Sequence, residues 1–210
     1  GGVDTLCLTT LYGFASLQLT SAQPCRPYDA ARNGISVGEG AAFALLERAG
    51  DPAPGSVLLL GTGESSDAYH MSSPHPEGLG ARLAMEAALR SAGLATADIG
   101  YINLHGTATP ANDAAEGKAV AALFGNTVPC SSTKGATGHT LGAAGAVEAV
   151  ICALALSDGF LPGSPGTQNL DPAMRLDYLL QGKAATVRHA LSNSFGFGGS
   201  NCSLILGVAP

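Results

Sequence analysis

Apolar and polar positions alternate between two spacings from residue 56 onward. Short apolar runs bounded by Gly, Ser or Asn predict buried strands, whereas longer segments with apolar residues every three or four positions predict helices. Strands that alternate with such helices indicate an α/β fold, a mixed sheet covered by helices, to which the last two strands add antiparallel neighbours. The predicted strands are 56–61, 99–104, 128–131, 185–192 and 202–208, and the predicted helices are 79–92, 113–124 and 142–157.

The first fifty residues show a weaker pattern. Apolar residues recur at helical spacing over 3–19, a loop follows at 24–29, and a glycine-interrupted turn leads into a predicted buried strand at 41–46. The stretch 48–55, RAGDPAPG, has two prolines and two glycines, so it is the candidate linker between residues 1–50 and 51–210. Because the helical pattern begins without an initiator Met or a polar leader, we expect a fragment or processed piece of a longer chain.

Composition narrows the function classes. Charged residues make up 12% of the chain, about half the usual share, so we expect extensive burial in the core or against a partner. The net charge of −6 and the lack of any Lys/Arg cluster argue against nucleic-acid binding. Five cysteines without a C-x-x-C pair suggest neither a zinc site nor a disulfide framework, and reduced thiols indicate a cytoplasmic protein. No signal-peptide pattern opens the chain. The longest apolar run, 141–156, contains Glu148 and is predicted to be too short to span a membrane.

Residues 130–156 combine a predicted strand, turn and helix with three ionisable side chains. A strand end is followed by a glycine turn and by a helix so apolar that we expect it to be covered on nearly every side. Lys134 and His139 lie at the junction, and Glu148 lies further along the helix. Donors at the start of a buried helix can stabilise an oxyanion. For this segment alone, a solvated Lys134 and a capping His139 remain an equal alternative.

Two further polar clusters follow predicted strands. These are HGTATP at 105–110 and NSFGFGG at 193–199, and they join STK at 132–134 with His139. In α/β folds ligands bind beyond the carboxyl ends of strands. A lone histidine at a strand end is more often structural, but two histidines with a lysine and a glycine-aromatic loop favour a functional site.

These clusters, in this order, resemble the β-ketoacyl synthases, the condensing enzymes of fatty-acid and polyketide assembly. The matching stretches are HGTATP, STKGATGH at 132–139 and NSFGFGGSN at 193–201, with support from 26–47 and 65–76. The resemblance implies a thiolase-like layered α/β/α/β/α fold, with residues 1–50 as the tail end of the N-terminal half and 51–210 as the C-terminal half. It also implies an acyltransferase that performs decarboxylative Claisen condensation of malonyl-acyl carrier protein with an acyl-enzyme thioester.

The resemblance assigns roles to the residues that match. His105 and His139 would donate hydrogen bonds to the enolate oxygen, and Lys134 would tune the local field with Glu148 as its partner. A polar Glu148 satisfied inside an apolar helix is an equal alternative. No metal and no covalently bound cofactor are implied.

The substrate would be carried on the phosphopantetheine arm of acyl carrier protein. Thr107 and Thr109 would bind this arm, although an ordinary Ser/Thr turn is the alternative. Phe197 would gate the acyl pocket with Phe195 beside it, whereas sequence alone would favour core positions for both rings. His70 and Met71 would line the entrance through which the arm reaches the site.

Two departures from the family pattern matter. The nucleophilic cysteine of the family lies upstream of all these motifs, and Cys130 is rejected as a substitute because we expect it to be buried in a strand. The isolated chain is therefore predicted to be inactive. Asn112 replaces a Gly that is usual in fatty-acid synthases of this type, which favours a specialised or secondary-metabolite pathway.

The expected partners are acyl carrier protein and a second subunit, in a homodimer or in a heterodimer with a chain-length partner. The alternative function is a non-catalytic, chain-length-factor-like partner of the same fold, but such partners lose site residues that this chain retains. A nucleotide-binding module is disfavoured because GATGHTLGAAG lacks the spacings of phosphate-binding glycine loops.

Overall fold

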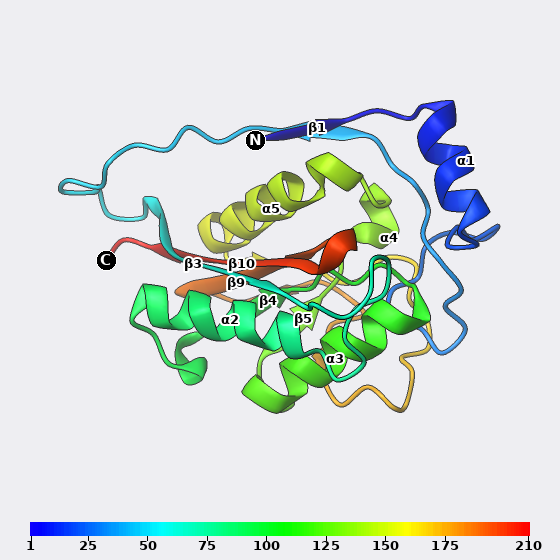
Figure 1. Cartoon of the computed structure of the whole chain (residues 1–210). Helices are drawn as coiled ribbons and strands as arrows, with labels where there is room; N and C mark the ends of the chain where they lie inside the picture. The colour runs from blue at the N-terminus through cyan, green and yellow to red at the C-terminus, as the bar shows by residue number, and fades with distance from the viewer.

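The computed structural model describes residues 1–210 and arranges them in layers around one six-stranded mixed sheet (Figure 1). The strand order is β3-β10-β9-β4-β5-β7. β3, β10 and β9 are antiparallel neighbours, whereas β9, β4, β5 and β7 are parallel. The predicted α/β class and the antiparallel final pair are therefore confirmed. The strands are β3 Val57–Ser66, β4 Tyr101–Asn103, β5 Pro129–Ser131, β7 Asp177–Tyr178, β9 His189–Phe195 and β10 Ser200–Val208.

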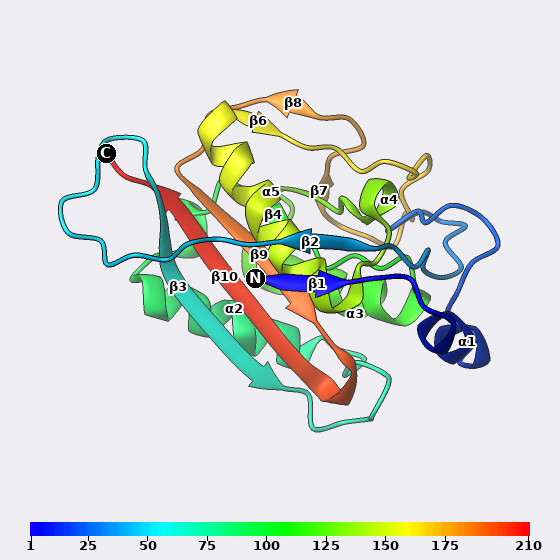
Figure 2. The same cartoon turned by 90° about the horizontal axis from the view of Figure 1, so that it is seen from above.

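Helices cover both faces of this sheet. α2 (Leu79–Ala92) and α3 (Pro110–Phe124) lie on one face, and α5 (Ala144–Asp158) lies on the other (Figure 1). A core of 17 buried residues fills the first interface, and a smaller core of seven lies under α5. Outside α5, the antiparallel pair β1 (Gly2–Asp4) and β2 (Gly40–Ala42) forms a further layer, which Figure 2 shows crossing over the helix. The layered arrangement is the one that the sequence motifs imply.

The remaining elements are short. Two-residue strands such as β6, β7 and β8 escape periodicity arguments because a period of two needs at least four residues to show. The short elements are α1 Leu8–Ser16, α4 Lys134–Thr137, β6 Phe160–Leu161, β8 Lys183–Ala184, and the 3-10 turns η1 Thr96–Asp98, η2 Leu141–Ala143 and η3 Phe197–Gly199.

Two strands extend further than predicted. β3 runs to Ser66, five residues beyond the predicted end of this strand at residue 61. β9 includes Asn193–Phe195, which the sequence placed in a loop, because β10 pairs with it up to Phe195 and Asn201. Pairing along a full neighbouring strand outweighs the weak strand propensity of Ser and Asn. The loop between β9 and β10 is thereby reduced to residues 196–199.

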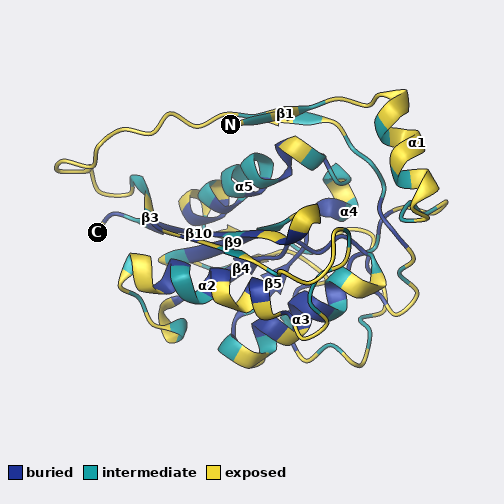
Figure 3. Ribbon diagram, in the orientation of Figure 1, coloured by how far each residue is buried: buried dark blue, intermediate teal, exposed yellow.

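The prediction of a buried strand at 41–46 is wrong. Only Gly40–Ala42 finds a strand partner, and most of the segment that follows is exposed (Figure 3). Phe43 is 73%, Leu45 86% and Leu46 72% accessible. No neighbouring element covers them, so apolar composition alone does not place them in a core. The linker predicted at 48–55 is an exposed connection without helix or strand.

The prediction that α5 is covered on nearly every side is also wrong. The helix carries both buried and exposed positions (Figure 3). Glu148, Cys152 and Leu156 are among the buried residues, whereas Leu154 is 54% exposed. By length and hydropathy Leu141–Asp158 could cross a membrane, so the expectation that this run is too short does not hold. In this fold 33% of the segment is buried, and α5 packs on β9 and β10.

Candidate active site

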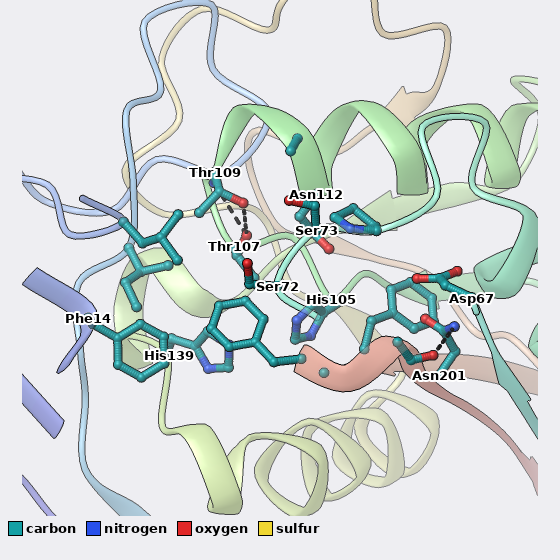
Figure 4. Close-up of a pocket in the computed structure, with 18 of the residues that line it drawn as sticks. Phe14, Asp67, Ser72, Ser73, His105, Thr107, Thr109, Asn112, His139 and Asn201 are labelled. Carbon is teal, nitrogen blue, oxygen red and sulfur yellow. Dashed lines mark hydrogen bonds between the residues drawn. The ribbon is translucent and has the colours of Figure 1, made fainter. Parts of the chain in front are cut away.

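The three polar clusters of the sequence meet at one edge of the sheet. His105 follows β4, Lys134 follows β5, and Phe195 ends β9, and these are adjacent parallel strands. Because the carboxyl ends of parallel strands share one edge, residues far apart in sequence converge there. A cavity of about 440 Å³ lies at this edge, lined by residues of all three clusters (Figure 4).

The position of His105 is fixed from behind by a buried carboxylate. Glu116 of α3 accepts the backbone N–H of His105 on Oε1 and that of Gly106 on Oε2, both at 2.8 Å. Tyr28 and Asn193 donate to the same carboxylate at 2.9 and 3.1 Å. Four donors satisfy a group that is 1% exposed, so the turn that carries the imidazole is rigidly held.

Lys134 joins the same turn to α5. Its ammonium donates to the His105 carbonyl oxygen at 2.5 Å and to Glu148, and it lies 3.4 Å from His105 Nδ1. Lys134 and Glu148 are 1% and 2% exposed. Burial raises the pKa of Glu148 to about 7, against the opposing pull of the lysine charge. The prediction that Glu148 pairs with Lys134 is confirmed, and the alternative of a solvated Lys134 is excluded.

The backbone of His139 is held by the N-terminal part of the chain. Its N–H donates to the Ser36 carbonyl at 2.7 Å, and its carbonyl accepts the Gly38 N–H at 3.0 Å. The side chain is fixed locally, since Nδ1 accepts the N–H of Leu141 at 3.2 Å. The backbone and the imidazole ring of His139 are therefore both held in a fixed orientation, just before the turn that leads into α5.

These contacts decide which nitrogen of each ring carries the proton. His139 Nδ1 accepts a backbone N–H, and His105 Nδ1 faces an ammonium that has only protons to give. In both neutral rings Nε2 must then be the N–H donor. The ring centroids are 5.2 Å apart at an interplanar angle of 81°, and both rings line the cavity. The pair presents two N–H donors at a common place.

Burial keeps both imidazoles neutral. It lowers the pKa of His139 to about 3 and holds the pKa of His105 well below its ordinary value, and the Lys134 charge adds to both shifts. Neutral imidazoles at physiological pH can donate through Nε2 without carrying a charge into the cavity.

The low pKa of His139 predicts a pH-dependent stability. Between pH 6.5 and 3 the folded chain binds fewer protons at this ring than the unfolded chain does, so the free energy of unfolding falls as the pH falls. Relative to His139→Gln, which cannot titrate, we expect the free energy of unfolding of the native chain to fall by about 1.6 kcal/mol between pH 6.5 and pH 5. Urea unfolding of both proteins at the two pH values measures this difference. A constant difference would contradict the expectation.

The cavity has a polar and an apolar part. Thr107 and Thr109 share a hydrogen bond of 2.8 Å between their hydroxyls and line the cavity together with Ser72 and Ser73 (Figure 4). Phe197 lines it among apolar side chains and stacks on Phe14 of α1, with ring centroids 5.8 Å apart. The hydrophobic side chains of the lining are Phe14, Leu19, Ile35, Ala111, Leu141, Phe195 and Phe197.

A second cavity of about 450 Å³ shares His105, His139 and Phe195 with the first. Most of its other lining residues come from β3, β10 and the start of α5, and Leu141, Ser194 and Gly196 complete it. Phe195 also contacts the His105 ring edge-on, with centroids 5.6 Å apart. The imidazole pair thus lies where two hollows meet.

The structure does not bring every predicted residue to the cavity. His70 is exposed, Met71 is 78% exposed, and neither lines the main or the second cavity, which does not support their placement at the entrance. Their neighbours Ser72 and Ser73 line it instead. Met71 contributes only its carbonyl, which accepts the N–H of Gly198 at 2.7 Å.

Sequence reasoning missed three contributors. Phe14 has no motif around it and reaches the cavity from α1. Asp113 and Glu116 hold the 105–108 turn, Asp113 by accepting the N–H groups of Thr107 and Ala108 at 3.0 and 3.2 Å. A signal existed for this pair: two carboxylates one turn apart on an otherwise small and apolar helix face are rarely buried without partners.

The thiols of the chain are all free. Cys130 is fully buried in β5, as expected, and burial raises its pKa well above the ordinary value. No cysteine lines the main cavity, although Cys202 lines the second one. No cluster of three or more His, Cys, Asp or Glu side chains is arranged to hold a metal ion.

Family models match both parts of the chain. Residues 57–168 match the model described as "Beta-ketoacyl synthase, C-terminal domain", and residues 1–51 match "Beta-ketoacyl synthase, N-terminal domain". The chain belongs to the β-ketoacyl synthase family. The resemblance of the three motifs is thus confirmed at the level of the family, and the thiolase-like layered fold with it.

Individual β-ketoacyl synthases are similar over most of the chain. The 3-oxoacyl-[acyl-carrier-protein] synthase 2 of Vibrio cholerae is 44% identical over 190 residues, which cover 86% of this chain and 46% of that protein. A mitochondrial 3-oxoacyl-[acyl-carrier-protein] synthase of Arabidopsis thaliana is 45% identical over 193 residues, 86% of this chain and 41% of the relative.

A solved structure is similar along the entire chain. The ketosynthase ApeO in complex with its chain length factor ApeC, from Xenorhabdus doucetiae, aligns with a TM-score of 0.90 and 47% identity, covering 100% of this chain and 52% of that one. The chain spans about half the length of the relatives that it matches.

Proposed function

We propose that the protein containing this chain is a β-ketoacyl-acyl carrier protein synthase, an acyltransferase that performs decarboxylative Claisen condensation in fatty-acid or polyketide biosynthesis. The observation that carries the proposal is the convergence of two neutral imidazoles, each with its Nε2–H free of protein partners and lining one cavity. Two aligned donors without a positive charge suit an oxygen that becomes anionic only during the reaction.

The chemistry assigns the same task to His105 and His139. When a malonyl thioester loses carbon dioxide, the electron pair of the broken C–C bond passes into the thioester, and its oxygen becomes an enolate oxygen. Hydrogen bonds from the two Nε2 atoms stabilise this charge. The enolate carbon then attacks the acyl thioester carbonyl, which forms the new C–C bond and expels the thiolate that carried the acyl group.

Lys134 and Glu148 act one step behind the rings. The ammonium faces His105 Nδ1, which fixes the tautomer that donates through Nε2. Glu148 neutralises the ammonium inside the protein and keeps it in place. Both residues are therefore proposed as orienting groups of the catalytic pair.

The two parts of the cavity suit the two parts of the substrate. Thr107 and Thr109 would bind amides of the phosphopantetheine arm of acyl carrier protein, the substrate carrier. Phe195 and Phe197 would border the acyl chain, with Phe197 as a gate because it lies on a glycine turn where Gly198 has φ 83°. No covalently bound cofactor takes part in this scheme.

The acyl-bearing thiol is proposed to lie outside this chain. Cys25, Cys130 and Cys152 are buried with raised pKa values, which disfavours the reactive thiolate. Residues 1–50 would then be the tail end of the N-terminal half and residues 51–210 the C-terminal half. The chain by itself is predicted not to condense.

Acyl carrier protein is the proposed partner, with a homodimer or a heterodimer containing a chain-length partner as the assembly. The names of the relatives include acyl carrier protein, and one solved relative is a complex with a chain length factor. Five free thiols support a reducing compartment, the cytoplasm.

The test uses the full-length natural protein. Carboxyl-labelled malonyl-acyl carrier protein should release carbon dioxide, and the residues 1–210 alone should neither condense nor acquire an acyl group on any of the five cysteines by mass spectrometry. If the full-length protein is folded and releases no carbon dioxide, the non-catalytic chain-length-factor-like function replaces the proposed one. Specific acylation of a cysteine in residues 1–210 would refute the placement of the nucleophile.

A further inference from the structure

Asn112 lies on the polar wall of the main cavity, at the first turn of α3. Figure 4 draws it beside Ser73, on the same side of the cavity as the Thr107–Thr109 pair and above the His105 ring in that view. The residue is partly buried, and the mechanism has no use for it. A polar side chain held in this place can contact whatever enters between the serines and the threonines.

The orientation of its amide is fixed by Asp113. Asp113 Oδ1 accepts the N–H groups of Thr107 and Ala108, so it acts as an acceptor, and Asn112 Nδ2 donates to it at 3.1 Å. The opposite orientation would place the amide oxygen of Asn112 against a carboxylate oxygen, which is repulsive. Oδ1 of Asn112 is therefore directed away from Asp113, and the side chain makes no hydrogen bond within the chain other than that from Nδ2.

The neighbouring hydroxyls complement this acceptor. Thr107 Oγ1 accepts the N–H of Thr109 at 3.3 Å and shares a proton with the Thr109 hydroxyl, so one hydroxyl proton of the pair remains to be donated. A donor from the threonines and a fixed acceptor from Asn112 on one wall match a secondary amide, which offers one C=O and one N–H. A thioester arm without amides has no N–H to donate to Asn112.

We propose that Asn112 is a specificity-determining residue whose Oδ1 accepts an N–H of an amide-containing thioester arm of the pantetheine type. The proposal rests on the proposed function, because it concerns the arm that would deliver the malonyl group. It goes further in assigning selection for an amide-bearing carrier to a residue at which the chain departs from the expected glycine.

The test compares malonyl thioesters that differ in amide content, using the full-length natural protein. The probes are malonyl-pantetheine with two amides, malonyl-N-acetylcysteamine with one, and malonyl-butanethiol with none. Asn112→Ala should raise KM for malonyl-pantetheine about 5- to 10-fold and leave kcat unchanged. This is the effect of losing one hydrogen bond that is made equally in the bound substrate and in the transition state. KM for malonyl-butanethiol should stay unchanged. Asn126→Ala, an exposed Asn→Ala control in the turn just after α3, should change neither value.

Two results would overturn the proposal. An equal loss with all three thioesters would mean that Asn112 merely supports Asp113 and the 105–108 turn, and no change with malonyl-pantetheine would mean that no contact exists. A separate binding measurement distinguishes this outcome from failure of the proposed function. If the native protein releases no carbon dioxide from any probe, the proposed function fails, and the Kd of pantetheine measured by NMR still decides the role of Asn112, since Asn112→Ala should weaken it about 5- to 10-fold.

Discussion

Replacing either imidazole should lower the rate of carbon dioxide release from malonyl-acyl carrier protein by about 100- to 1,000-fold in the full-length protein. His105→Ala and His139→Ala each remove one of the two Nε2–H donors that line the cavity. A donor prepared for a developing charge acts in the transition state more than in the bound substrate, so the loss should appear in kcat. The rates are measured at saturating malonyl-acyl carrier protein.

The same experiment has an internal control. His70 is exposed and precedes the lining residues Ser72 and Ser73 in sequence, but it does not line the cavity itself. His70→Ala should therefore leave kcat unchanged. A decrease of less than tenfold for either cavity histidine, with the fold intact by circular dichroism, would argue against enolate stabilisation by the pair. A comparable decrease for His70→Ala would point instead to damage of the 67–78 loop.

Removing one partner of the buried ion pair should be the most destabilising single change at the site. Glu148→Ala leaves the Lys134 ammonium buried without its counter-charge, and we expect a loss of about 3–5 kcal/mol in the free energy of unfolding. The double variant Lys134→Met with Glu148→Leu removes both charges and keeps apolar volume in their place. It should recover most of that loss. The cost of removing one partner comes mainly from the unpaired charge that stays buried, and the ion pair itself contributes less to the free energy of unfolding.

Urea unfolding monitored by circular dichroism checks this expectation. The exposed pair of Lys118 and Glu77, with side chains 51% and 71% accessible, is the matched control, and Lys118→Ala should cause no clear change. If the double variant is as unstable as Glu148→Ala, the packing of the side chains rather than the charge balance is the cause.

Much of the site could be predicted because each of its polar clusters is contiguous in sequence and follows a predicted strand. The pairing of Lys134 with Glu148 follows from a lysine at a strand end and one carboxylate inside an apolar helix, since a buried ammonium requires a counter-charge. Convergence of the clusters follows from the rule that parallel strands end at one edge. Helix bounds were well predicted where glycines end the helix, as at Gly93 after α2, and α3 begins three residues early because Pro110 suits a first helical position.

The parts that could not be predicted depend on tertiary contacts. Whether Phe43 is buried depends on which strand lies beside it, and Phe14 reaches the cavity only because α1 folds back toward the loop at Phe197. The strand character of Asn193 is decided by pairing with β10 rather than by propensity. In each case the residue type is compatible with two environments, and the neighbour selects one.

The backbone contacts of His139 with Ser36 and Gly38 join the two family regions at the reactive centre. Because the ring belongs to one region and the peptide groups that hold it belong to the other, a shift of residues 36–38 would move the ring with them. The two regions therefore share one fixed geometry at the candidate site, although along the chain they are joined only by the exposed connection at 48–55.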